Sequence, residues 1–238
     1  MAPQPVSTMK WNGNFMFGND VLIDRPDHGS HVAAAISGWA IIEAMLGRTF
    51  AILIGARQPV TMTMYSATRS FDVQRELFMA AVNAVMPKKY AELIAATLVV
   101  INRSAIHRHR FAHWIWGASA DPALQALFLV EPKNFWNLTA AQTRFWQRRG
   151  MKRLASGPMY SIDPEMPQLS GDHIFVYRLK DLKEIVKEIE RAHSLVDKLR
   201  DLVASKNPMR HAIATWLGNQ PDTRLVLEKA KSNQKPKG

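Results

Sequence analysis

Arginine, histidine and tryptophan crowd into one stretch of the chain, between Arg103 and Gly117. It contains three arginines, three histidines and two tryptophans, namely Arg103, His107, Arg108, His109, Arg110, His113, Trp114 and Trp116. No acidic residue occurs between Glu92 and Asp121. Histidine exchanges protons near neutral pH, the arginine fork binds phosphate, and tryptophan stacks on bases. These are the groups needed to bind and cleave RNA without a metal.

Two other interpretations of the same residues stay open. Cationic histidines are favourable at a helix C-terminus and tryptophans often belong to a core, so the stretch can be purely structural. His109 and His113 are four residues apart and share one helical face, a spacing that can chelate zinc. No HExxH glutamate or third ligand accompanies them, and the flanking arginines repel a cation. We therefore expect no metal and no other cofactor.

The string RHRFAHWIWG, from Arg108 to Gly117, resembles the RNxxAHGxWG string of one branch of the HEPN superfamily (higher eukaryotes and prokaryotes nucleotide-binding). The family signature is an arginine, four to six further residues, and a histidine. Arg108 and His113 match this spacing, and His109 occupies the polar position after the arginine. His109 replaces the common asparagine, and Trp114 replaces the common glycine. The flanks, from about Gly29 to Ser205, also resemble uncharacterised bacterial members.

The resemblance implies a metal-independent endoribonuclease that works as a homodimer, with two signature motifs facing one cleft. His113 would be the general base for the 2′-OH, Arg108 would stabilise the phosphorane-like charge, and His109 would assist it or orient the phosphate. The expected products are a 2′,3′-cyclic phosphate and a 5′-OH. Five neighbours would bind the RNA: Arg103, His107, Arg110, Trp114 and Trp116. Active members are frequently toxins, so an antitoxin-like partner is a further expectation.

Other HEPN members bind RNA or nucleotides without catalysis, or serve as scaffolds, and this alternative stays open. Arg108 and His113 are five residues apart and differ by roughly 140° around a regular helix. A helix irregularity, the length of the arginine or a partner subunit must therefore bring them together. Glu43 lies in an apolar helical stretch, so we expect it to pair with a buried cation, Arg48 or Arg108, and to support the site.

Long helices are the elements that must position these groups. The apolar pattern predicts helices over 29–57, 70–85, 89–115 and 182–203, and the cluster occupies the second half of the third helix. Ser70 is expected to cap the second helix. The short apolar runs 126–130 and 174–177 are expected to pair as a two-stranded antiparallel ribbon, with a short helix over 140–150 between them. The predicted fold class is an all-α, up-and-down helical bundle with a small β appendage.

Three regions follow from this pattern. Residues 1–28 mix proline, glycine and asparagine and are expected to be irregular. Residues 29–205 form the HEPN-like helical domain, with a loop and β insertion over 118–178. Residues 206–238 form a short helix, expected over 211–217, and a basic flexible tail. The heptad spacing of apolar residues from Leu182 to Val203 is consistent with packing within one chain or between two chains.

Composition limits the function classes. The chain has 238 residues, a formal net charge of +11 and no cysteine, which excludes a disulfide scaffold, a thiolate metal site and a cysteine nucleophile. The excess of positive charge favours anionic partners. The apolar stretch Val32 to Ala56 contains Glu43 and Arg48, each costing about 2.5–3.5 kcal/mol in a bilayer. We therefore expect a buried helix, no membrane association and, without a secretory signal, a cytoplasmic protein.

Overall fold

The structure is a computed structural model that describes residues 4–8, 15–68, 70–119, 125–148 and 165–233. Parts of every expected region lie outside the described residues: 1–3 and 9–14 of the N-terminal segment, 69 of the helical domain, 120–124 and 149–164 of the insertion, and 234–238 of the tail. The described part is mostly helical, as the sequence predicts. Its helices are α1 (Pro26–Ile54), α2 (Gln58–Ala67), α3 (Phe71–Val85), α4 (Lys88–His113), α5 (Pro132–Arg148), α6 (Leu179–Ala204), α7 (Met209–Gly218) and α8 (Pro221–Asn233).

The chain folds into two compact units, each assembled from distant parts of the sequence. The sheet unit comprises Met1–Ala33 and His109–Glu184, and the helical unit comprises Ala34–Arg108 and Ile185–Gly238. Helices α1, α4 and α6 each contribute residues to both units. The cluster from Arg103 to Gly117 is therefore divided between them.

The sheet unit is built around an antiparallel sheet that has five strands among the described residues, in the order β1-β5-β4-β3-β2. The strands are β1 (Gln4–Pro5), β2 (Phe15–Phe17), β3 (Ile115–Ser119), β4 (Ala126–Val130) and β5 (Ile174–Arg178). Every residue of β4 is buried, and strands flank it on both sides. In the part of the unit that the structure describes, short 3₁₀ helices accompany the sheet at Val6–Thr8, Asn19–Leu22 and Gly171–His173.

The two-stranded ribbon expected from the sequence is confirmed as the centre of this sheet. β4 and β5 pair antiparallel, with Leu127 opposite Tyr177. The prediction was wrong about the number of strands, since the described residues form five and not two. β3 occupies residues assigned to the end of a helix and to the insertion, while β1 and β2 come from the segment 1–28 expected to be irregular. Strands this short carry too little pattern to be recognised before their partners are known.

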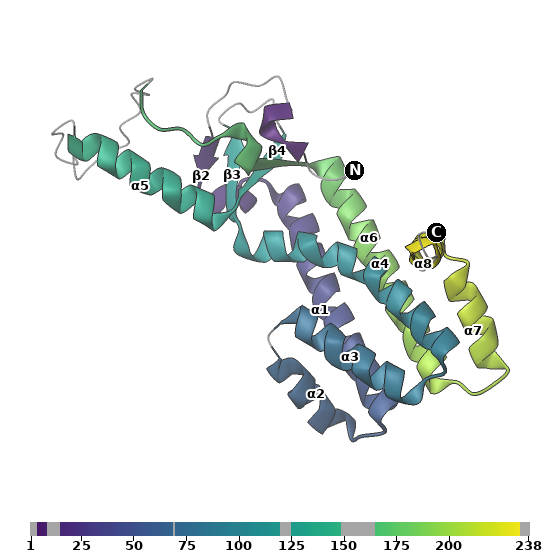
Figure 1. Ribbon diagram of the computed structural model, residues 1–238. Helices are drawn as coiled ribbons and strands as arrows, with labels where there is room; N and C mark the ends of the chain where they lie inside the picture. Colours follow the sequence, from purple (N-terminus) through teal and green to yellow (C-terminus); the bar gives the residue numbers. More distant parts are fainter. Residues whose placement is uncertain (1–3, 9–14, 69, 120–124, 149–164, 234–238) are drawn as a thin grey trace. The chain divides into compact units, whose positions relative to one another are not determined.

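A hydrophobic cluster on this sheet joins the strands to α5. Its buried members are Val6, Ala126, Phe128, Val130, Ile174 and Val176. Phe17, Phe135 and Leu169 pack against it, with the rings of Phe17 and Phe135 5.4 Å apart. α5 begins at Pro132, a residue suited to the first turn of a helix, and not at the expected Ala140. Figure 1 shows α5 leading away from the strands β2 and β3.

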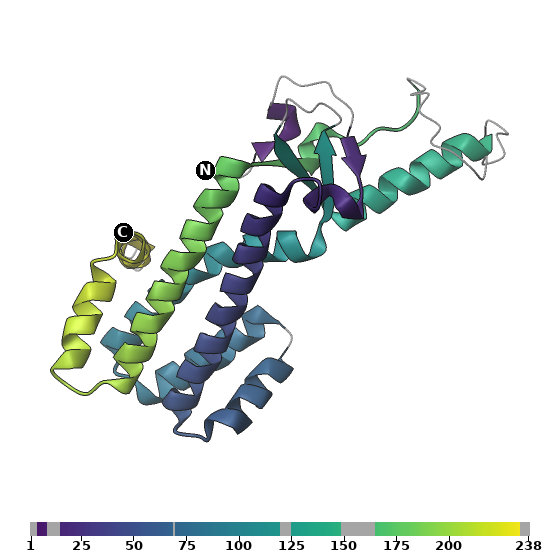
Figure 2. The same ribbon diagram turned by 180° about the vertical axis from the view of Figure 1, so that it is seen from behind.

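In the helical unit, α1 and α6 lie side by side (Figures 1 and 2). A Cβ atom on Gly38 would lie 2.8 Å from the Cγ2 atom of Ile189, so glycine is what permits this close approach. The heptad residues of α6 within this unit are buried in the single chain: Ile185, Ile189, Ala192, Val196, Leu199 and Val203. Their packing is thus internal to one copy.

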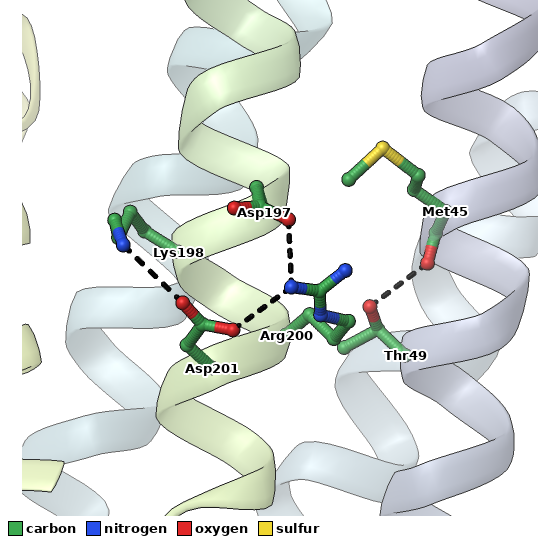
Figure 3. A network of polar contacts seen from close by, with 6 residues as sticks. All are labelled: Met45, Thr49, Asp197, Lys198, Arg200 and Asp201. Carbon is green, nitrogen blue, oxygen red and sulfur yellow. Dashed lines mark hydrogen bonds and ion pairs between the residues drawn. The ribbon is translucent and has the colours of Figure 1, made fainter.

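Polar groups of the same two helices are paired locally. Figure 3 shows Arg200 of α6 between the carboxylates of Asp197 and Asp201, at N–O distances of 2.8 and 3.0 Å, with Lys198 3.3 Å from Asp201. On α1, the buried Thr49 hydroxyl donates to the carbonyl four residues earlier at 2.8 Å, which satisfies it within its own helix. Solvent-accessible ion pairs contribute about 0–1 kcal/mol each, so the apolar packing carries most of the stability.

Several helix boundaries differ from the sequence prediction. α1 ends at Ile54, where Gly55 adopts a φ of 63° that terminates the helix. Pro59 lies in the first turn of α2, a helix that the sequence analysis missed. α8 was also missed. α3 confirms the second helix, although the Ser70 side chain forms no capping hydrogen bond.

By length and composition, one helix in the described part of the chain, α1, is apolar enough to cross a membrane. Its buried positions recur at helical spacing and include Ala35, Trp39, Ile42 and Leu46. Core helices of soluble proteins share these properties. The expected cytoplasmic location and absence of membrane association stay predictions.

Candidate active site at the end of helix α4

Two of the expected catalytic residues, His109 and His113, lie together on the last turn of α4. Their ring centroids are 4.9 Å apart with an interplanar angle of 53°, and both residues are exposed. The helix ends immediately after them, with the Trp114 N–H donating to the Arg110 carbonyl at 2.9 Å. Two adjacent exposed imidazoles can accept a proton from one ligand atom and donate a proton to another.

Arg110 and Trp114 are engaged in packing within the sheet unit. The guanidinium carbon of Arg110 lies 5.0 Å from the centre of the Trp114 ring and 4.7 Å from that of Phe175. Burial raises the pKa of Tyr177 on β5, and the positive charge of the nearby Arg110 opposes this shift. Arg110 therefore packs the end of α4 against β5. No local sequence pattern predicts this role.

Trp116 also contributes to packing. It lies on β3 opposite Leu129, and its ring centroid is 5.6 Å from that of Phe111. Phe111 is buried and meets the ring of Tyr177 edge-on at 5.3 Å. The sequence left open whether these tryptophans belong to a core. In the structure, Trp114 and Trp116 both pack against neighbouring side chains, as that interpretation predicts.

The helical unit holds the remaining members of the cluster. Arg103 is exposed, and Arg108 is half-buried. His107 is buried, with its Nε2 atom 3.8 Å from a carboxylate oxygen of Glu188 on α6. The members of the cluster most accessible to a ligand are therefore Arg103, His109 and His113.

Arg108 and His113 are not brought to one helical face. α4 is an uninterrupted α-helix from Lys88 to His113, so the separation of roughly 140° expected from helix geometry applies. A helix irregularity between the two residues is excluded. The Arg108 guanidinium can then come close to a His113 ring only through the length of the arginine side chain or through a second copy of the chain.

Glu43 forms a different contact from the one expected. Its Oε1 atom accepts a hydrogen bond from Trp39 Nε1 at 2.9 Å. Within the described residues it forms no ion pair with Arg48 or Arg108, so the expected pairing was wrong. Arg48 is exposed, and solvent hydrates its charge without a buried partner. Glu43 orients Trp39, whose ring meets Phe71 edge-on at 5.3 Å.

A second surface suited to binding runs along α5. Lys133, Asn137, Arg144 and Arg148 follow one another at steps of four, seven and four residues, so they share one exposed face. Trp136 lies beside this face and is 66% exposed. No acidic residue occurs within the helix. The sequence analysis missed this face because it predicted only the second half of the helix.

A cavity of about 600 Å³ lies within the sheet unit and was also missed. It borders on His28 and on three aspartates near the start of α1. Among the described residues, no group of three or more histidine, aspartate or glutamate side chains is placed to hold a metal ion. The sequence signal that could have pointed to the cavity is the density of aspartates between Asp20 and Asp27.

Comparison with known proteins adds no neighbour, since no protein-family model, curated protein or solved structure matches this chain. The HEPN resemblance therefore stays a hypothesis carried by the string from Arg108 to Gly117.

Proposed function

We propose that the protein is a metal-independent endoribonuclease with a HEPN-like helical bundle that acts as a homodimer. The observation that carries the proposal is the exposed pair of His109 and His113, with ring centroids 4.9 Å apart on the last turn of α4. No acidic residue occurs from Leu93 to Ala120, so a phosphate at this pair meets no repulsion from neighbouring positions along the chain. The pair thus combines proton-exchanging groups with a basic stretch of sequence.

In the proposed reaction, His113 in its neutral form accepts the proton of the RNA 2′-OH, and the 2′-oxygen attacks the adjacent phosphorus. The bond from phosphorus to the 5′-oxygen breaks, and a protonated imidazole returns a proton to that oxygen. His109 lies close enough to orient the same phosphate or to deliver this proton. The products are a 2′,3′-cyclic phosphate and a 5′-OH, with no change in oxidation state.

Arg108 stabilises the negative charge that builds on the phosphorus oxygens. Because the continuous helix turns Arg108 away from His113, Arg108 of one copy acts beside His113 of the other in this mechanism. Dimerisation is thereby part of the catalytic mechanism.

The experiment is cleavage of end-labelled RNA in EDTA by the wild type and by His113→Ala, His109→Ala and Arg108→Ala. Loss of a general base lowers the rate by about 10²–10⁴-fold. The matched control is His211→Ala, which removes an exposed histidine from α7. The cleaved ends are tested for the cyclic phosphate. The proposal is contradicted if the wild type is as silent as the three site variants, or if His113→Ala is as active as the wild type.

Mixing the two inactive variants Arg108→Ala and His113→Ala tests the shared site. If the two residues act across the dimer, half of the randomly mixed dimers regain one of two sites, which restores about a quarter of wild-type activity. Failure of the mixture to regain activity, with mixed dimers shown to form, contradicts a site shared between copies.

The second candidate function is RNA binding without cleavage. The basic face of α5, with its exposed Trp136, favours it, since this surface has the features of a single-strand binder and the helix carries no histidine. Salt-sensitive retention of RNA with intact ends in EDTA is the result expected of such a protein.

A further inference from the structure

The end of α4 and the start of α5 lie at the same end of the sheet. In the antiparallel pair of β3 and β4, Ile115 is opposite Val130. His113 precedes Ile115 by two residues, and Lys133 follows Val130 by three residues. One residue spans at most about 3.6 Å of chain and paired Cα atoms are about 5.5 Å apart, so the Cα atoms of His113 and Lys133 are at most about 24 Å apart. Both residues belong to the sheet unit.

From this end of the sheet, α5 extends away from the strands (Figures 1 and 2). Its 17 residues correspond to a length of about 25 Å. Phe135 packs against the hydrophobic cluster of the sheet, and it lies on the opposite side of the helix from Lys133. The basic face is therefore turned away from the sheet.

The charges of this face are not neutralised by packing. Lys133, Arg144 and Arg148 are exposed, and within the residues that the structure describes none of the three forms an ion pair. Trp136 flanks the face and is 66% exposed. Cations bind phosphates, and an exposed indole ring stacks on a base. The bases of a duplex already stack on one another, so this combination favours a single strand.

We propose that single-stranded RNA binds along the basic face of α5 and continues past Glu131 to the His109 and His113 pair, where it is cleaved. The inference rests on the proposed function and names a single strand of several nucleotides as the substrate. α5 is then a docking site that holds the RNA on one side of the scissile phosphate. It differs from binding without cleavage because both surfaces act on one strand.

Glu131 supplies a negative charge between the two surfaces. It is exposed in the link from β4 to α5, and its Oε2 atom accepts a hydrogen bond from Asn134 Nδ2 at 3.4 Å. A phosphate positioned between Lys133 and His113 is repelled by this carboxylate. Glu131→Gln removes the charge and keeps an oxygen acceptor for Asn134, so we expect this variant to bind the strand more tightly.

The test compares three substrates in EDTA: a single-stranded RNA of about 12 nucleotides, its duplex with the complementary strand, and a mixture of all RNA dinucleotides. A dinucleotide contains only the scissile phosphate and therefore leaves no phosphate for α5. We expect the wild type to cleave the single strand with the highest kcat/KM. Equal kcat/KM for the strand and the dinucleotides, or for the strand and the duplex, overturns docking on α5 while the nuclease itself stands. Silence of the wild type on all three overturns the proposed function and this inference with it.

Variants locate the docking site. Trp136→Ala, and a triple variant that replaces the three cations of the face by alanine, are expected to raise KM for the strand more than they lower kcat, because docking holds substrate and transition state alike. For Trp136→Ala the expected rise is about 5- to 150-fold, which corresponds to the loss of one stacked base. Glu131→Gln is expected to lower KM by about 1.4- to 5-fold.

The matched control is Trp216→Ala, which removes an exposed tryptophan of the helical unit. Its KM is expected to equal that of the wild type. Circular dichroism establishes that each variant is folded. Unchanged KM in the folded α5 variants overturns the docking site. A KM of Glu131→Gln that equals or exceeds the wild-type value overturns the course of the strand past this residue.

Discussion

Replacing Lys133, Arg144 and Arg148 together by alanine is expected to flatten the salt dependence of RNA binding. All three are exposed on one face of α5, and no acidic residue of the helix screens them. For single-stranded nucleic acid the slope of log K against log salt is about −0.7 per phosphate neutralised, so three lost contacts change it by about 2. Over a fourfold increase in salt, this corresponds to a difference in affinity of roughly 15- to 20-fold.

The assay is fluorescence anisotropy of a labelled single-stranded RNA titrated at about 50 and 200 mM salt. The matched control, Lys206→Ala with Lys229→Ala and Lys231→Ala, removes three exposed cations from the helical unit. Equal slopes for the two triple variants refute the assignment of RNA binding to α5. Stacking by Trp136 is tested in parallel: Trp136→Ala is expected to lose about 1–3 kcal/mol of binding, and Trp216→Ala, an exposed tryptophan on α7, to lose none.

Three further predictions concern stability, each measured by urea unfolding. Phe128→Ala, in the fully buried strand β4, is expected to lower the free energy of unfolding by about 3–5 kcal/mol, and a loss below about 1 kcal/mol contradicts the central position of β4. Gly38→Ala places a Cβ atom 2.8 Å from Ile189 Cγ2 and is expected to cost about 1–3 kcal/mol, less when Ile189 is also alanine. An equal cost in both backgrounds argues against the close approach. Because burial lowers the pKa of folded His28, the unfolded chain binds more protons below about pH 6.5, so stability falls as the pH drops. His28→Asn is expected to lessen that fall, and an unchanged pH dependence contradicts the reasoning.

Local patterns were sufficient for most of the long helices and for the composition of the candidate site. The heptad spacing of α6 and the apolar stripe of α3 are repeated within one helix, so they are visible without any tertiary information. The sequence analysis also predicted that the two apolar runs, now seen as β4 and β5, pair with each other. The helical periodicity also placed His109 and His113 on one face, where the structure has them 4.9 Å apart.

The role of each residue in the cluster required the tertiary structure. Arg110 is held by Trp114 and by Phe175, a residue far along the chain, and His107 faces Glu188 on α6. The same residue types at neighbouring positions therefore divide into packing groups and accessible groups. Sequence spacing gives the face of a helix, but it does not say what lies against that face.

The sequence by itself determined most of the long helices, the basic character and the positions of the histidines, because helical periodicity and charge are properties of neighbouring residues. Only the tertiary structure decided that two short N-terminal strands complete a sheet around β4, and that His28 with three aspartates borders a cavity. A strand of two or three residues has no stability until its backbone groups pair with a strand distant in sequence. A cavity exists only between elements that have already packed, so no pattern of neighbouring residues predicts it.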